Sequence, residues 1–216
     1  MRYLPLFVLA LIAGGSFWAT HWIAVDAPLL LAWKGAGVAL LAVWAALNAR
    51  QFDGWLLTAV LTFGAIGDVL LNPANMAIGG LAFFIAHLAA IALYARRRGR
   101  WAGAAPLIAV AVAAIAWSLP ADRGAAAGIA FYALGLGGMA GTALVSRYPR
   151  AVSLGAFMFV ASDLLIFARL GPLHGSEIAD VLIWPLYFGC QALVAWTVVR
   201  TLLRRGRVPD VMAVPQ

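Results

Sequence analysis

The chain has 216 residues, of which 65% are hydrophobic and only 11% are charged. A soluble domain carries about 25% charged residues, so lipid must be the solvent for much of this chain. The net charge of +7 does not indicate nucleic-acid binding, because the basic residues lie in short clusters between apolar segments, as in membrane proteins. The single cysteine, Cys190, excludes an intrachain disulfide and a cysteine-rich zinc site.

Eight apolar segments approach the ~20 residues that a membrane-spanning helix needs. In chain order they are Leu4 to Thr20, Pro28 to Leu47, Trp55 to Leu71, Ala77 to Ala95, Gly103 to Leu119, Gly124 to Val145, Val152 to Leu170 and Asp180 to Leu203. The first could instead be a signal peptide, but it lacks a clean small-x-small cleavage site. We predict an all-α, polytopic membrane helix bundle of about eight transmembrane helices. It forms one domain over residues 1–207, with a short disordered tail at 208–216.

Arginine placement predicts the orientation. When the connections are assigned alternately to two sides, only Arg123 and Arg169 fall on one side and all other arginines on the other. The positive-inside rule then places both termini in the cytoplasm. The predicted location is the bacterial cytoplasmic (inner) membrane.

Six polar side chains lie inside the apolar segments. Lysine or aspartate near a helix centre costs ~2.5–3.5 kcal/mol, so such residues should face the bundle interior or a wet cavity. With a rise of ~1.5 Å per residue, all six fall in the outer half of the membrane or at its midplane. We therefore predict a single pocket that opens outward and is lined by Lys34, Asp68, His87, Asp163, Tyr187 and Gln191.

Structural roles remain open for each of these residues. An aspartate could form a buried ion pair with Lys34, or the lysine could extend to the outer interface. His87 and Gln191 could be interhelical hydrogen-bond partners, and Tyr187 could simply pack. Four tryptophans near segment ends are expected to anchor the interface: Trp33, Trp55, Trp101 and Trp184.

The two aspartates lie in similar local sequences. Gly67-Asp68-Val69-Leu70-Leu71 resembles Ser162-Asp163-Leu164-Leu165-Ile166, four segments later and running in the same direction. A parallel four-plus-four repeat would place the two aspartates symmetrically.

Paired carboxyl groups in an apolar pocket suit acid–base chemistry, because their environments can hold one protonated and one ionised. The sequence has no Gly-x-Ser-x-Gly elbow, no His-Glu-x-x-His motif and no phosphate loop. No metal site is predicted, because the outer-loop histidines match no metal spacing. The class of enzyme reaction that remains is water-dependent acid–base chemistry on a lipid-soluble substrate.

Three stretches resemble the YhhN family of lysoplasmalogenase-like membrane proteins: Phe63 to Leu71, Gly79 to His87 and Gly155 to Asp163. Departures are Lys34-Gly35, where that family usually has Lys-Pro, and Ala89-Ala90, where an aromatic residue commonly follows the histidine.

The resemblance implies a fold of eight membrane spans and an enzyme that hydrolyses the vinyl ether bond of lysoplasmalogens. Its partner would be a lysophospholipid substrate, and no cofactor is implied. Asp68 and Asp163 would be the catalytic pair, His87 would relay protons or position water, and Lys34 would hold the headgroup phosphate. Tyr187 and Gln191 would complete the hydrogen bonds. The alternatives are a proton-coupled transporter of small amphiphiles and a noncatalytic lipid-binding protein.

Overall fold

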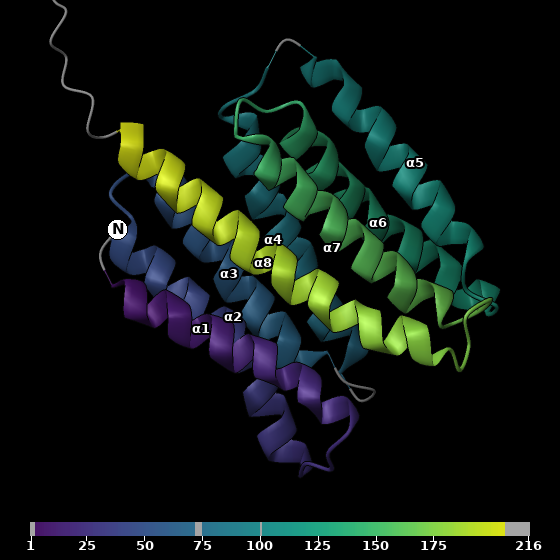
Figure 1. The fold of residues 1–216 in the computed structure, drawn as a ribbon. Coiled ribbons are helices and arrows are strands. Elements are labelled where there is room, and N and C mark those ends of the chain that lie inside the picture. The colour runs from purple at the N-terminus through teal and green to yellow at the C-terminus, as the bar shows by residue number, and fades with distance from the viewer. Residues whose placement is uncertain (1–2, 72–74, 100, 206–216) are drawn as a thin grey trace, which may run out of the picture.

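The computed structural model describes residues 3–71, 75–99 and 101–205, which form an all-α bundle of eight helices (Figure 1). Seven segments of this described part are long and apolar enough to cross a membrane, which indicates an integral membrane protein and confirms the predicted fold class. The helices are α1 (Leu4–Ser16), α2 (Ala27–Asn48), α3 (Phe52–Leu70), α4 (Met76–Ala95), α5 (Ala105–Ser118), α6 (Arg123–Leu144), α7 (Arg150–Ala168) and α8 (Glu177–Arg205), with 3₁₀ helices η1 (Phe17–His21) and η2 (Ala102–Ala104).

Three elements differ from the predicted segments. The first span is an α-helix only to Ser16 and continues as η1. Helix α5 has 14 residues, because a proline lies in its first turn and Pro120 follows it closely. Helix α8 has 29 residues and therefore extends beyond its predicted segment at both ends. The single domain over residues 1–207 stays a prediction, and the predicted tail at 208–216 lies outside the described residues.

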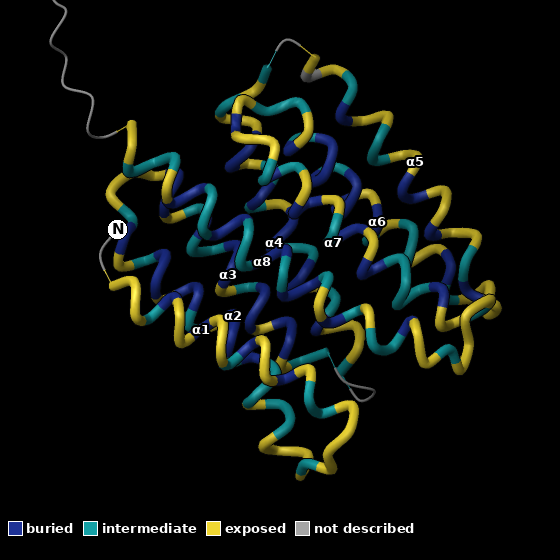
Figure 2. The backbone as a smooth tube through the Cα atoms, viewed as in Figure 1, coloured by how far each residue is buried: buried dark blue, intermediate teal, exposed yellow. Residues whose placement is uncertain are grey.

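Small residues let the helices approach closely. A Cβ on Gly37 of α2 would lie 2.5 Å from the Cα of Gly14 on α1, and a Cβ on Gly141 of α6 would lie 2.9 Å from the Cα of Ala105 on α5. Such contacts are typical of helix pairs in lipid, where packing rather than the hydrophobic effect drives association. Figure 2 shows the result, with buried positions along the inner faces of the helices and exposed positions outward.

The arginine-rich connections lie together at one end of the bundle. The backbone of Arg98 forms an isolated antiparallel β-bridge with that of Ser146. Arg97 forms a 2.9 Å ion pair with Asp53 at the start of α3. Burial raises the pKa of Tyr148 to about 12, so this side chain is neutral where its ring packs on Arg97. The connections after α5 and α7 meet at the opposite end. This grouping agrees with the alternating assignment of connections, whereas the side of the membrane that each end faces stays a prediction.

Trp184 is not an interface anchor, so that prediction was wrong. It is 5% exposed, donates to the carbonyl of Gly14 at 2.7 Å, and packs on Tyr187 with ring centroids 5.5 Å apart. The next residue, Pro185, has no N–H for the carbonyl of Val181, which instead accepts from Trp18 Nε1 at 2.9 Å. Helix α8 is thereby tied to the N-terminal helices just before it reaches the polar layer.

Candidate active site

Asp68 lies two residues before the end of α3 and is 1% exposed. Its Oδ2 accepts a hydrogen bond of 2.8 Å from the hydroxyl of Tyr187, which in turn accepts one of 3.4 Å from Gln191 Nε2. Gly64 makes this approach of α3 to α8 possible, because a Cβ there would lie 3.1 Å from Gln191 Nε2. The structure therefore brings together Asp68, Tyr187 and Gln191, which the sequence analysis assigned to one site.

Asp163 on α7 forms a second chain of hydrogen bonds, and this chain contains a residue that the sequence analysis missed. Its Oδ2 accepts from the hydroxyl of Tyr132 at 2.7 Å, and the same hydroxyl lies 3.0 Å from His87 Nε2. Tyr132 lies nine residues after Arg123 on α6, at ~14 Å from the start of the helix. That depth matches the predicted polar layer, and it was the signal that could have identified this tyrosine.

Ser162 holds α7 against α8 beside Asp163. It is fully buried and donates to the carbonyl of Ile183 at 3.0 Å. Because Ile183 lies two residues before Pro185, this contact and the proline act on the same turn of α8. The turn that carries Tyr187 is therefore positioned from α7 as well as from α1.

Two phenylalanines separate the two hydrogen-bonded chains. The ring of Phe159 lies 5.0 Å from that of His87 and 5.2 Å from that of Tyr187, and Phe83 lies 5.7 Å from Tyr187. Phe83 also fills the space beside Gly67, where a Cβ would lie within 2.7 Å of its ring. Apolar walls of this kind keep bulk water away from the carboxyl groups and strengthen the electrostatic interactions between them.

Lys34 on α2 faces the same layer. It is half-buried, and its charge interacts with that of Asp68. Among the described residues it forms no ion pair within 4.0 Å. The ammonium group is therefore near Asp68 but remains available to another anion.

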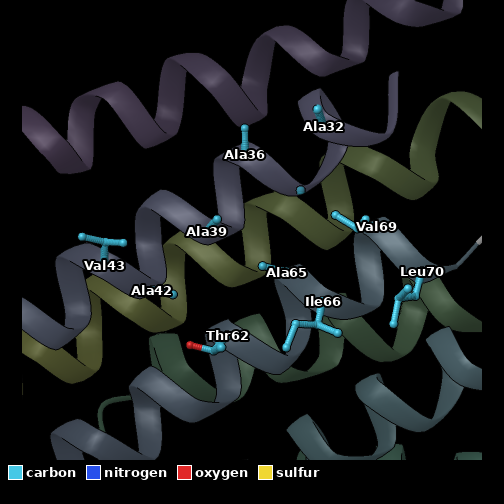
Figure 3. A pocket seen from close by; sticks show the side chains of 11 residues that line it. Ala32, Ala36, Ala39, Ala42, Val43, Thr62, Ala65, Ile66, Val69 and Leu70 are labelled. Carbon is cyan, nitrogen blue, oxygen red and sulfur yellow. The ribbon is translucent and has the colours of Figure 1, made fainter. Parts of the chain in front are cut away.

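The site is closed, so the predicted outward-opening pocket was wrong. Five of the six predicted side chains are buried, and the aromatic rings pack between them. A cavity of about 590 Å³ is instead a groove between α2 and α3, lined by alanine, glycine and larger aliphatic residues and by Thr62 (Figure 3). Asp68 does not line this groove, and Ile66, which does, lies about 160° from Asp68 around α3, given 100° per residue.

A second cavity, of about 20 Å³, lies inside the bundle. His87 and Gln191 both line it, together with Tyr94, Cys190 and small or apolar side chains from α3, α4, α6, α7 and α8. No group of three or more histidine, cysteine, aspartate or glutamate side chains within the described ranges could hold a metal ion.

A family model described as the YhhN family matches residues 29–198. The chain belongs to the YhhN family. The match includes all six predicted site residues as well as Tyr132, and it confirms the resemblance identified from the sequence. Searches of curated proteins and of solved structures give no match.

Proposed function

We propose that this YhhN-family protein hydrolyses the vinyl ether bond of lysoplasmalogen-type lysophospholipids, giving a fatty aldehyde and a glycerophospho-headgroup. The observation that carries the proposal is the pair of buried aspartates, each bonded to a tyrosine and both within one aromatic-walled layer. The family includes lysoplasmalogenases, which supports the same reaction class. The protein acts in the bacterial cytoplasmic membrane with both termini in the cytoplasm.

The surroundings of the two aspartates favour different roles. Burial disfavours the carboxylate form of both aspartates, but the positive charge of Lys34 acts in favour of it at Asp68, whereas no cation among the described residues acts on Asp163 in this way. Asp163 accepts from the hydroxyl of Tyr132, which also contacts His87, so these two side chains can pass a proton along their hydrogen bonds. We therefore assign Asp163 as the acid and Asp68 as the carboxylate that faces the positive charge formed in the reaction.

The reaction then proceeds in three steps. Asp163 donates its proton to the vinyl carbon remote from the ether oxygen, which leaves an oxocarbenium ion. Asp68 stabilises this cation and accepts a proton from the water that adds to it, much as paired carboxylates do in glycosidases. The resulting hemiacetal separates into the aldehyde and the glycerol hydroxyl, so one water is consumed and one proton is both used and released.

The position of the layer favours an enzyme over a transporter. Asp68 and Asp163 lie ~3 and ~8 Å from the helix ends opposite the arginine-rich end. The buried residues of α8 beyond Gln191 are all apolar, namely Val194, Ala195, Val198 and Val199. A transported solute would need polar groups along that half, whereas a hydrolase needs access from one side only.

The test is aldehyde release from a lyso vinyl-ether phospholipid by the purified protein in detergent, beside Asp68→Asn and Asp163→Asn. Wild type should release aldehyde, and each variant should lose about 10²–10⁴-fold in kcat while its melting temperature shows a folded protein. Both amides keep the size of the carboxyl group, so packing is preserved.

No aldehyde from folded wild type with several headgroups would refute the hydrolase and favour transport or lipid binding. Full activity in both variants would refute the assignment of the two aspartates while leaving the reaction in place.

A further inference from the structure

The two hydrogen-bonded chains of the site end at the same small cavity. One runs from Asp163 through Tyr132 to His87, and the other from Asp68 through Tyr187 to Gln191. Both end residues line the 20 Å³ cavity, whereas neither aspartate does. The two chains can therefore be joined through this cavity.

Each of the two residues at the ends of these chains has one side-chain polar atom that takes no part in the chain of hydrogen bonds. His87 uses Nε2 toward Tyr132, and Gln191 uses Nε2 toward the hydroxyl of Tyr187. Within the described part of the chain, neither His87 Nδ1 nor Gln191 Oε1 has a hydrogen-bond partner, although the two residues are only 1% and 3% exposed. Neither of these two atoms is fully sealed by its neighbours, so a molecule of the size of water can reach each of them and supply the missing hydrogen bond.

The size of the cavity limits that ligand to one molecule of water. A water needs about 10–15 Å³ of such space and two to four polar partners. The cavity has about 20 Å³, and Tyr94 and Cys190 are among the residues that line it. An ion is not favoured there, because no charged side chain lines the cavity.

The hydrogen-bond directions along the Asp163 chain also require a ligand that can both donate and accept. When Asp163 is ionised, Tyr132 donates to it, so His87 must donate from Nε2 and Nδ1 is an acceptor. When Asp163 is protonated it can donate to Tyr132, which then donates to Nε2 and leaves the ring proton on Nδ1. Water satisfies Nδ1 in both states and can donate to Gln191 Oε1 in both.

We infer that the cavity is a binding site for one structural water, which bridges His87 Nδ1 and Gln191 Oε1 and joins the two halves of the active site. Its role rests on the proposed hydrolysis. By donating to Nδ1 when Asp163 is ionised and accepting from Nδ1–H when Asp163 is protonated, the water maintains the hydrogen bond between His87 and Tyr132 in both protonation states of the acid.

The site is tested directly by an experimental structure of the full-length protein at a resolution that shows ordered water. We expect a density peak at about 2.7–3.2 Å from both His87 Nδ1 and Gln191 Oε1. A cavity without such a peak overturns the inference. This result does not depend on aldehyde release, so the water site and the proposed reaction can fail separately.

The role is tested by filling the cavity with Ala156→Val, since Ala156 lines it and is 2% exposed. Loss of the peak together with about a tenfold fall in kcat supports the role, because His87 and Gln191 lose their shared partner. Loss of the peak with wild-type kcat overturns it. Ala140→Val is the matched control, a buried alanine on α6 that does not line the cavity. If Ala156→Val fails to fold, Ala90→Val fills the same cavity from α4.

Discussion

Asp68 on α3 and Asp163 on α7 follow similar sequences, and each accepts a short hydrogen bond from a tyrosine hydroxyl, at 2.8 and 2.7 Å. Their further neighbours differ. Asp68 has the charge of Lys34 nearby and an amide behind its tyrosine, whereas Asp163 has an imidazole behind its tyrosine. Similar local sequence therefore places two carboxyl groups alike, and the helices packed against them divide their roles.

After the two aspartate variants, the largest effect is expected from removing the two tyrosine hydroxyls one at a time. Tyr132→Phe should lower kcat about 10- to 100-fold, because Asp163 loses its donor and its connection to His87. Tyr187→Phe should have a smaller effect, about tenfold, because the charge of Lys34 still acts on Asp68. Aldehyde release under saturating substrate measures both.

Tyr148→Phe is the control for this pair, because Tyr148 lies at the arginine-rich end, near Arg97. Its activity should equal that of wild type. A larger loss from Tyr187→Phe than from Tyr132→Phe would reverse the assignment of acid and carboxylate.

Lys34 should contribute to binding of the substrate phosphate rather than to proton transfer, and this would distinguish the Asp68 half of the site from the Asp163 half. Lys34→Met should raise KM about tenfold for a lysophospholipid, because the phosphate loses its cation, while Lys34→Arg should retain most of the affinity. A phosphate-free alkenylglycerol provides the matched substrate control, and its KM should not change in either variant. An equal rise in KM for both substrates would argue against phosphate binding by Lys34.

The smallest effect is expected at the contact between α3 and α8. Gly64→Ala places a Cβ 3.1 Å from Gln191 Nε2, so the amide of Gln191, which donates to Tyr187, must shift by a few tenths of an ångström. We expect a fall of about threefold in kcat and little change in melting temperature.

Gly80→Ala is the control, because a Cβ there meets nothing within 4 Å. It should leave activity unchanged and stabilise α4 by about 0.5–1 kcal/mol. If Gly64→Ala also leaves activity unchanged, the spacing of α3 and α8 does not limit the reaction.

The sequence alone predicted much of the site because polar groups in lipid have few permitted positions. Asp68, His87 and Asp163 stand out against an apolar background, and the cost of exposing them to lipid directs them inward. Tyr132 was missed because a tyrosine beside Phe131 resembles ordinary packing or an interface residue. Trp184 was misassigned for the opposite reason, since its position near a segment end is typical of an anchor although its side chain lies inside.

What the sequence by itself determined is the class of protein, the number of helices and the layer in which the polar side chains lie, because hydropathy and helical rise act along the chain. What only the tertiary structure decided is which groups meet: Tyr132 with both Asp163 and His87, Tyr187 with Asp68, and two chains ending at one cavity. These contacts depend on the rotation and spacing of neighbouring helices. Glycine contacts such as that of Gly64 with α8 set both, and no local pattern in the sequence records them.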